Sequence, residues 1–380
     1  MTFKTLDKLD VKGKRVLVRV DFNSDIQKGK VVLSERLTGP LETIKELRKR
    51  CARVILLAHQ GRPGSSDYTS LKQHAALLNH YLKIIFVPDV IGVRARKAIV
   101  GLSDGDVLLL DNIRSVPDEF KPDKPHNQLL KALFPLTDFY VNDAFSVSHR
   151  EQTSIVSFPR FMPSAIGRLM ERELAGAARL NMKHALLVLG GSKPTDNLAL
   201  ANHFSHSRVL ASGLFGPYCL MKQGVKFGKE ERILKKELAQ GTLVNNTSRR
   251  IETPVDFGIE RKGKRVNIVL DELPLSEEIF DIGPDTIARF SREILSAKAV
   301  FFKGLAGLCH TDPFCMGTRV LLKALEYSDA YSVVCGGHTT AALDRFKINR
   351  KKLGHVSLAG GALVRYLAGE KLPGLVVLER

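Results

Sequence analysis

The sequence predicts an α/β protein of two domains, each a parallel sheet with helices on both faces, joined by a long helix. Three observations predict this fold class. Short β-branched and aliphatic runs alternate with helical patterns along nearly the whole chain, as in successive βαβ units. The chain has 380 residues, of which 44% are apolar, which is enough for two cores. One long amphipathic stretch at 167–180 separates two such series.

The first 145 residues contain five expected strands with helical segments between them. Apolar residues spaced by three and four predict helices at 40–50 (PLETIKELRKR) and 70–82 (SLKQHAALLNHYL). The strands are expected at 15–22 (RVLVRVDF), 53–59 (RVILLAH), 83–89 (KIIFVPD), 106–112 (DVLLLDN) and 138–145 (DFYVNDAF).

A second series follows the amphipathic stretch, and several of its strands end in glycine. The strands are expected at 184–191 (HALLVLGG), 208–213 (RVLASG), 264–270 (KRVNIVL), 299–304 (AVFFKG), 330–337 (AYSVVCGG) and 354–361 (GHVSLAGG). We expect all of them in an α/β domain like the first.

Composition limits the classes of partner. The net charge of +18 is typical of a protein that attracts anions. Basic clusters at 45–50, 260–265 and 347–352 lack interleaved aromatic residues, so nucleic acid is not the expected partner. No apolar run approaches the roughly 18 residues of a membrane span, and the polar start does not resemble a secretory signal, so a soluble cytoplasmic protein is expected.

The cysteines do not predict a disulfide framework. They are odd in number and scattered, at positions 51, 219, 309, 315 and 335. Chains held together by disulfides instead have an even number of cysteines at closely repeated spacings.

Anion-binding side chains follow the expected strands of the first half, where ligands of such folds bind. They are Asp21, Asn23, four arginines (Arg36, Arg62, Arg114 and Arg150) and two histidines (His59 and His149). Guanidinium groups bind phosphate and carboxylate oxygens in pairs, so the cluster predicts a small, highly negative metabolite. The alternative is that each arginine pairs with a neighbouring carboxylate, but four arginines at equivalent strand ends favour the ligand.

Glycines end the expected strands of the second half. They are Gly190 and Gly191 (followed by Ser192 and Lys193), Gly213, Gly304, Gly307, Gly336, Gly337, Gly360 and Gly361. Glycine lets a ligand approach the backbone, and Lys193 would be a point charge beside phosphates, so a nucleotide is predicted. The segment VCGGHTTAAL at 334–343 predicts a strand, a tight turn and a helix start, which is a cradle for phosphate.

Taken in order, these segments resemble the phosphoglycerate kinase family over essentially the full length, in a compact, archaeal-like form. The matching segments are RVDFN (19–23), SERLTGPLETI (34–44), AHQGRP (58–63), LLLDNIR (108–114), YVNDAFSVSHR (140–150), GRLMERELA (167–175), GGSKPTDN (190–197), DIGPDTI (281–287) and LPG (372–374).

The resemblance implies two Rossmann-like three-layer α/β/α domains. A phosphoglycerate-binding domain would cover 1–166, a hinge helix 167–182 and a nucleotide-binding domain 183–380, with the last residues able to return to the first domain. It implies reversible phosphoryl transfer between 1,3-bisphosphoglycerate and ADP, which gives 3-phosphoglycerate and ATP, with Mg²⁺ accompanying the nucleotide.

The resemblance also assigns roles to residues. Arg36 and Lys193 would be catalytic, because they would neutralise the transferred group once the hinge closes. The phosphoglycerate would be bound by Asp21, Asn23, Arg36, His59, Arg62, Arg114 and Arg150. The nucleotide would be bound by Gly191, Ser192, Lys193, Gly213, Gly304, Gly307, His310, Gly336, Gly337, His338 and Thr339.

The nucleotide half departs from the family pattern. Asn197 stands at the second lysine of the pattern GGxKxxDK, and Lys303 stands at the asparagine of a later segment. His310 replaces a glutamate that binds the ribose, and His338 replaces the aspartate that holds the Mg²⁺ of the nucleotide. Because negative charge is lost and positive charge gained, we expect the site to favour bare anions over a Mg²⁺-nucleotide.

These departures leave alternatives open. The chain could be a phosphotransferase of the same fold that uses another phosphate carrier, such as a different nucleotide or pyrophosphate. It could also be a non-catalytic protein that binds or senses phosphoglycerate. A bound metal is a further possibility, with candidate ligands at Cys309, His310, Cys315, Cys335 and His338, although their spacing matches no common zinc pattern.

Overall fold

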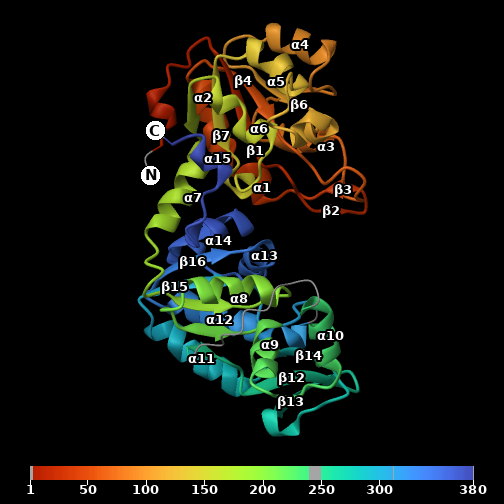
Figure 1. Ribbon diagram of the computed structural model, residues 1–380, viewed down its shortest axis with the longest axis vertical. Helices are drawn as coiled ribbons and strands as arrows, with labels where there is room; N and C mark the ends of the chain where they lie inside the picture. The colour runs from red at the N-terminus through yellow and green to blue at the C-terminus, as the bar shows by residue number, and fades with distance from the viewer. Residues whose placement is uncertain (1–2, 239–249, 311, 380) are drawn as a thin grey trace. The chain divides into compact units, whose positions relative to one another are not determined.

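The structure is a computed structural model that describes residues 3–238, 250–310 and 312–379. The chain forms two compact units (Figure 1). The first comprises Met1–Leu174 and Gly369–Arg380, and the second comprises Ala175–Ala368. Helix α7 (Arg168–Ala178) carries the chain from the first unit into the second, and it is shorter than the stretch 167–182 that the sequence suggested.

The first unit contains a six-stranded parallel sheet in the order β5-β6-β4-β1-β7-β8. Its strands are β1 (Arg15–Val20), β4 (Arg53–Leu57), β5 (Ile85–Val87), β6 (Val107–Leu110), β7 (Phe139–Asp143) and β8 (Ser164–Ile166). The chain adds strands first on one side of β1 and then on the other, so the topological switch point lies between β1 and β7. A small antiparallel hairpin, β2 (Ile26–Gln27) and β3 (Lys30–Val31), follows β1.

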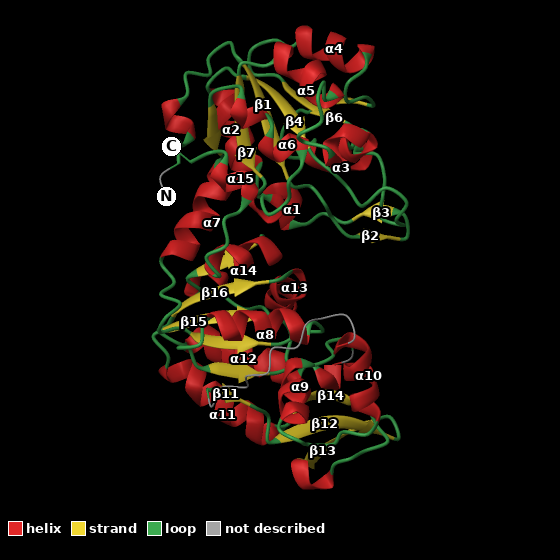
Figure 2. Ribbon diagram, in the orientation of Figure 1, coloured by secondary structure: helices red, strands yellow, loops and turns green. Residues whose placement is uncertain are grey.

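Helices cover both faces of this sheet (Figure 2). Alternate residues of β1 point to opposite cores: Val18 packs with α1, α2 and α3, and Leu17 packs with α4 and α5. The helices are α1 (Glu35–Thr38), α2 (Leu41–Lys49), α3 (Lys72–Leu78), α4 (Val93–Val100), α5 (Gln128–Leu133), α6 (Thr153–Val156) and α15 (Pro373–Val376).

The second unit contains a six-stranded parallel sheet in the order β11-β10-β9-β15-β16-β17. Its strands are β9 (Leu186–Leu189), β10 (Val209–Ala211), β11 (Ile251–Glu252), β15 (Ala299–Lys303), β16 (Tyr331–Cys335) and β17 (His355–Ser357). This order places the switch point between β9 and β15. The α/β fold class with largely parallel sheets is therefore confirmed.

Helices flank this sheet as well, and apolar residues of α11, α12 and α13 form one core with its strands. The helices are α8 (Pro194–His203), α9 (Phe215–Lys222), α10 (Lys229–Leu238), α11 (Pro284–Ser296), α12 (Met316–Tyr327), α13 (Gly337–Arg345) and α14 (Gly361–Leu367). In the part of the chain that the structure describes, no helix has the length and apolar character needed to cross a membrane.

One expectation for this unit was wrong. The strand expected at 264–270 is β13 (Lys264–Val269), which lies outside the parallel sheet. It pairs antiparallel with β12 (Asp256–Arg261), which also pairs with β14 (Ile279–Ile282). The connection between β12 and β13 is Lys262–Gly263, and both residues have positive φ. Two such residues make the tight turn of a β-hairpin, which a crossover to a parallel strand does not allow.

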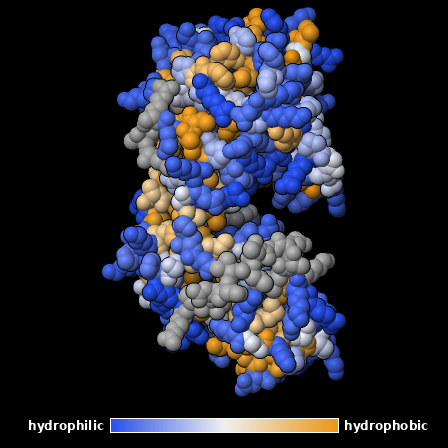
Figure 3. All heavy atoms as spheres, viewed as in Figure 1, coloured by the Kyte–Doolittle hydropathy of each residue, from blue (hydrophilic) through white to orange (hydrophobic). Residues whose placement is uncertain are grey.

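The visible surface of both units is mostly hydrophilic, and apolar side chains appear in small groups (Figure 3). This agrees with the cores, because central strands such as β1 and β9 are almost entirely buried, whereas the edge strands β5 and β17 are partly exposed. The polar groups that matter for function are therefore those at the strand ends.

Candidate functional site

The first unit brings the predicted anion-binding residues together beyond the carboxyl end of its sheet. Asp21 follows β1, His59 follows β4, and Arg114 lies in the 3-10 turn after β6. Asn23 lies in the connection after β1, Arg36 in α1, Arg62 in the connection after β4 and Arg150 in the connection after β7. Hydrogen bonds link them, because the backbone N–H of Gly61 donates to Oδ1 of Asn23 at 2.8 Å and Arg114 donates to the carbonyl of Gly61.

Asp21 is the acidic centre of this cluster. Its carboxylate is 5% exposed and accepts hydrogen bonds from Arg36 at 2.6 Å, from Ser146 and from the N–H of Asn23. Burial is the largest influence and opposes ionisation, but the charge of Arg36 and the Ser146 hydroxyl outweigh it and hold the pKa of Asp21 below its ordinary value. Asp21 is therefore ionised and orients Arg36. Because Ser146 follows β7, this contact spans the switch point.

A buried arginine that the sequence analysis did not single out lies beneath the cluster. Arg19 is inside β1 and is fully buried, and its Nη2 lies 3.1 Å from Nδ1 of His59. Its Nε donates to Ser154 at 2.9 Å, and Ser154 in turn donates to the buried carboxyl of Glu119 at 2.7 Å. The signal was present, since an arginine inside an apolar strand is rarely buried without a partner.

His59 is neutral at this place. Burial lowers its pKa well below the ordinary value; Asp21 opposes this shift, while Arg19 and Arg114 add to it. A neutral imidazole can accept one hydrogen bond and donate another, so His59 can contact a ligand without adding positive charge.

Three arginines of the cluster have no acidic partner. Among the described residues, only Arg36 of the four predicted arginines forms an ion pair, so the alternative in which each arginine is neutralised by its neighbour does not hold. Arg114 is 5% exposed and its Nε is buried without a hydrogen-bond partner. Burial, and then the charges of Arg150 and Arg19, lower the pKa of Arg114 to about 10. Burial and then Arg62 likewise lower the pKa of Arg150. The unit therefore presents uncompensated positive charge to an anion.

The predicted glycines of the second unit fall into two groups. Those after β9, β10 and β15 pack backbone against backbone: a Cβ on Gly304 would lie 2.2 Å from the carbonyl oxygen of Gly190, and one on Gly213 would lie 2.5 Å from the nitrogen of Gly191. Gly307 packs instead on a side chain, because a Cβ there would lie 2.3 Å from Oδ1 of Asp281. These glycines hold strand ends together.

The second group faces open space. Nothing lies within 4 Å of a Cβ placed on Gly337, Gly360 or Gly361. Gly337 begins α13, so its turn exposes backbone N–H groups at a helix start. Thr339 is 1% exposed and its hydroxyl accepts a hydrogen bond from the N–H of Gly304 at 3.0 Å, so this side chain ties α13 to β15.

The charged side chains of this half include two lysines. Lys193 is exposed and precedes α8, next to Ser192, which is exposed too. Lys303 ends β15, is half-buried and donates to Oδ1 of Asn197 at 2.6 Å. The predicted residues His310 and His338 are both exposed.

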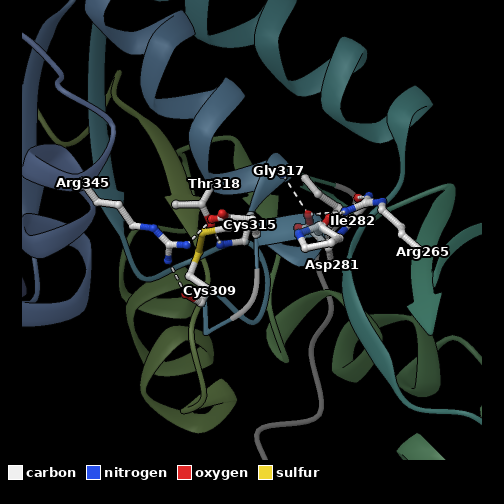
Figure 4. The surroundings of a disulfide bond; sticks show 11 residues. Arg265, Asp281, Ile282, Cys309, Cys315, Gly317, Thr318 and Arg345 are labelled. Atoms are coloured by element: carbon white, nitrogen blue, oxygen red, sulfur yellow. Dashed lines mark hydrogen bonds and ion pairs between the residues drawn. A yellow bond between two sulfur atoms is a disulfide. The ribbon is translucent and has the colours of Figure 1, made fainter. Parts of the chain in front are cut away.

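A disulfide closes the loop that contains His310 (Figure 4). Cys309 and Cys315 are joined, whereas Cys219 and Cys335 are buried as free thiols. Arg345 of α13 donates to the carbonyl of Cys309. The cysteine count did not predict this bond, because a single short loop leaves no pattern in the spacing.

A second contact fixes the far side of this loop. Arg265 of β13 donates to the buried carboxylate of Asp281 at 2.7 Å and to the carbonyl of Pro313 at 2.6 Å. Asp281 also accepts from the N–H of Gly317 at 2.9 Å, in the first turn of α12. The loop between β15 and α12 is therefore held from both sides.

The donor set does not fit a metal held by the protein. The described residues contain no group of three or more His, Cys, Asp and Glu side chains that could bind an ion. Two of the candidate zinc ligands, Cys309 and Cys315, are joined in the disulfide, and a disulfide sulfur is not a thiolate ligand. His338 offers an imidazole where a hard Mg²⁺ ion prefers oxygen.

Comparisons with known proteins agree over the full length. The sequence model of the family described as "Phosphoglycerate kinase" matches residues 6–370. The phosphoglycerate kinase of Methanothermus fervidus is 37% identical, with 99% of this chain and 97% of that protein covered. That of Sulfurisphaera tokodaii is also 37% identical, with 100% and 96% covered. The crystal structure of the phosphoglycerate kinase from Pyrococcus horikoshii superposes with a TM-score of 0.89 at 32% identity, with 99% and 98% covered.

Proposed function

The chain belongs to the phosphoglycerate kinase family, a family of phosphotransferases with a carboxyl acceptor, and from this premise we propose how its residues carry out the reaction. The reaction is reversible phosphoryl transfer between 1,3-bisphosphoglycerate and ADP, which gives 3-phosphoglycerate and ATP. A non-ATP phosphate carrier and a purely sensing role are not favoured by these relatives.

The acceptor half of this proposal is supported by one observation: three arginines that have no acidic partner among the described residues follow strands β4, β6 and β7 at the carboxyl edge of the first sheet. Arg62, Arg114 and Arg150 would bind the phosphate and carboxylate oxygens of 3-phosphoglycerate, and Asn23 and His59 would donate or accept at its polar groups. Binding an anion would neutralise the charge that lowers the pKa of Arg114 and Arg150.

Catalysis would depend on positioning and on neutralised charge, since phosphoryl transfer needs little covalent help. Arg36 would neutralise the transferred group, because the ionised Asp21 holds its guanidinium at 2.6 Å in a fixed orientation. Lys193 would neutralise the same group from the nucleotide half. No other acid or base is required of the protein.

The nucleotide half would bind phosphates through backbone N–H groups and lysines rather than through a metal. Gly336 and Gly337 open α13 toward the ligand, and Gly191, Ser192 and Lys193 follow β9. The residues do not fit a protein-held Mg²⁺, so any Mg²⁺ would be carried by the nucleotide and water. A location in the cytoplasm and ATP as the nucleotide stay predictions.

Calorimetric titration of the purified protein tests this proposal. Its ligands are 3-phosphoglycerate, and separately ADP and ATP with and without Mg²⁺. We expect both 3-phosphoglycerate and an adenine nucleotide to bind, and a coupled assay to detect turnover. The variant Arg114→Met should lose 3-phosphoglycerate binding and keep nucleotide binding. If neither ADP nor ATP binds, with or without Mg²⁺, the ATP-dependent reaction is refuted. The proposal for the phosphoglycerate site is not affected by that result.

A further inference from the structure

Two polar residues meet at the switch point of the second unit. Lys303 is the last residue of β15, paired with Leu189 of the neighbouring strand β9. Asn197 lies in α8, the helix that follows β9. The Lys303 ammonium donates to Oδ1 of Asn197 at 2.6 Å. This edge of an open α/β sheet is where ligands bind.

The amide of Asn197 is held in one orientation. The side chain is fully buried, and its Nδ2 donates to the carbonyl of Gly190 at 2.8 Å. The amide oxygen must therefore point to Lys303. Asn197 receives the ammonium without neutralising it, because an amide carries no charge.

Lys303 is a half-buried cation with an incomplete set of partners. An ammonium has three donors. In the described chain, Lys303 forms one side-chain hydrogen bond, to Asn197, and no ion pair. Burial lowers its pKa; Cys335 and then Asp196 oppose this shift, and Lys193 adds to it, so the two ammonium groups are close enough to act on each other. Two cations near one strand edge favour the binding of an anion.

The pair also reverses an arrangement in the family pattern. The pattern has a lysine at 197 and an asparagine at 303, and this chain has asparagine at 197 and lysine at 303. The sequence suggested a lost lysine at 197 and, separately, an added positive charge at 303. The hydrogen bond shows that the two positions touch, so the ammonium and the amide are exchanged between α8 and β15 relative to that pattern.

We propose that Lys303 binds the phosphate chain of the nucleotide and that Asn197 positions it, as a reciprocal exchange that keeps one ammonium at this place. This inference rests on the proposed function. Lys303 then acts with Lys193, and the nucleotide half keeps its cationic character despite Asn197.

A purely structural role would make a different prediction. If Lys303 only ties β15 to α8, a neutral side chain that keeps the hydrogen bond should leave ligand affinity unchanged. Lys303→Gln is such a variant, because its amide can still donate to Asn197. The affinity for nucleotide therefore separates the two roles.

The test is a set of four variants: Lys303→Gln, Lys303→Asn, Asn197→Lys and the exchange Asn197→Lys/Lys303→Asn. The probes are ADP and pyrophosphate without Mg²⁺, measured by calorimetry. Lys303→Gln and Lys303→Asn should weaken both probes roughly 10- to 100-fold, as expected for one lost charge-assisted contact. Asn197→Lys should lower thermal stability, because two ammonium groups then share one place. The exchange should recover ADP affinity to within about threefold of the parent, since it restores one ammonium and one amide.

Controls separate this inference from the proposed function. Lys298→Asn removes an exposed lysine just before the same strand and should leave both probes unchanged. The affinity for 3-phosphoglycerate should stay constant in every variant. If the parent protein binds no nucleotide, the proposed function fails. If the parent binds ADP and Lys303→Gln binds it equally well, or the exchange binds it no better than Lys303→Asn, only the role of Lys303 is refuted.

Discussion

Replacing Arg114 with methionine should stabilise the free protein and weaken its binding of 3-phosphoglycerate. The guanidinium is 5% exposed and forms no ion pair among the described residues. Its pKa falls from 12.5 to about 10, first through burial. In the unfolded chain the charged guanidinium is fully hydrated, whereas in the folded protein it is buried. At neutral pH this burial of charge lowers the stability of the folded protein, and the loss of stability disappears only above about pH 10, where the folded protein releases the proton.

The magnitude follows from these contacts. A fall from 12.5 to about 10 corresponds to about 3 kcal/mol. Solvent screening reduces this to about half. The variant also loses the hydrogen bond to the carbonyl of Gly61, which costs about 1 kcal/mol. The net gain is on the order of 0.5 kcal/mol, which raises the melting temperature by about 1–2 °C.

Adding 3-phosphoglycerate should reverse the order of the melting temperatures of Arg114→Met and the parent protein. At one hundred times its Kd, 3-phosphoglycerate stabilises the parent protein by about 2.7 kcal/mol. If affinity falls about 10- to 100-fold, the same concentration stabilises the variant by only about 1.4 to 0.4 kcal/mol. Melting curves with and without 3-phosphoglycerate should therefore cross over. The variant melts higher alone, and the parent melts higher with ligand.

A matched variant tests the specificity of this effect. Arg96→Met removes an exposed arginine of α4 in the same unit and should change neither curve. If Arg114→Met melts below the parent without ligand, the argument from uncompensated charge is wrong. If 3-phosphoglycerate protects Arg114→Met as well as the parent, Arg114 does not belong to the acceptor site.

Three further predictions concern the remaining groups. Burial raises the pKa of Asp143 to about 6, from 3.8, so the protein should lose stability as pH rises between about 4 and 6. In urea titrations at several pH values, Asp143→Asn should remove on the order of 2–3 kcal/mol of this loss. If the free energy of unfolding falls with pH equally in both proteins, this prediction is wrong. Lys193→Met should lower kcat about 10²- to 10³-fold with the Kd for 3-phosphoglycerate unchanged; a fall below about fivefold in the coupled assay would exclude a catalytic role. Reducing the Cys309–Cys315 disulfide should destabilise the second unit by about 2 kcal/mol, since the bond restricts a short loop of the unfolded chain. Cys309→Ser should be destabilised to the same extent as the reduced protein. Identical denaturation curves for the reduced and the oxidised protein would overturn this prediction.

The parts that could be predicted from the sequence are those with local signals. Apolar runs that alternate with amphipathic segments located the parallel sheets, because a strand buried on both faces leaves a continuous apolar run. The rule that ligands bind at strand ends then selected Asp21, His59 and Arg114, which the structure brings together. The strand at 264–270 was assigned to the wrong sheet because the residues of a strand do not show which other strand it pairs with.

The parts that could not be predicted depend on contacts between distant residues. Asn197 and Lys303 are 106 residues apart, so the loss of a lysine at one position and the added positive charge at the other looked unrelated. Arg19 carried a signal as an arginine inside an apolar strand, but its partners Ser154 and His59 lie 135 and 40 residues away along the chain, so the sequence could not identify them. The glycines after β9, β10 and β15 looked like a ligand cradle, whereas most of them make room for one another.

The two groups of glycine should differ in what a population of mutants can tolerate. A side chain at Gly190, Gly213 or Gly304 would force strand ends apart, so a library selected only for abundant folded protein should already lack changes there. Side chains at Gly337 and Gly361 meet no neighbour, so they should survive that first selection, whereas Gly360 has a φ of +52° that strains any other residue. Substitutions at Gly337 and Gly361 should be lost only in a second selection, in which growth of the cell depends on the activity of the protein. Sequencing the survivors of the two selections would thus separate, glycine by glycine, the demands of folding from the demands of the ligand.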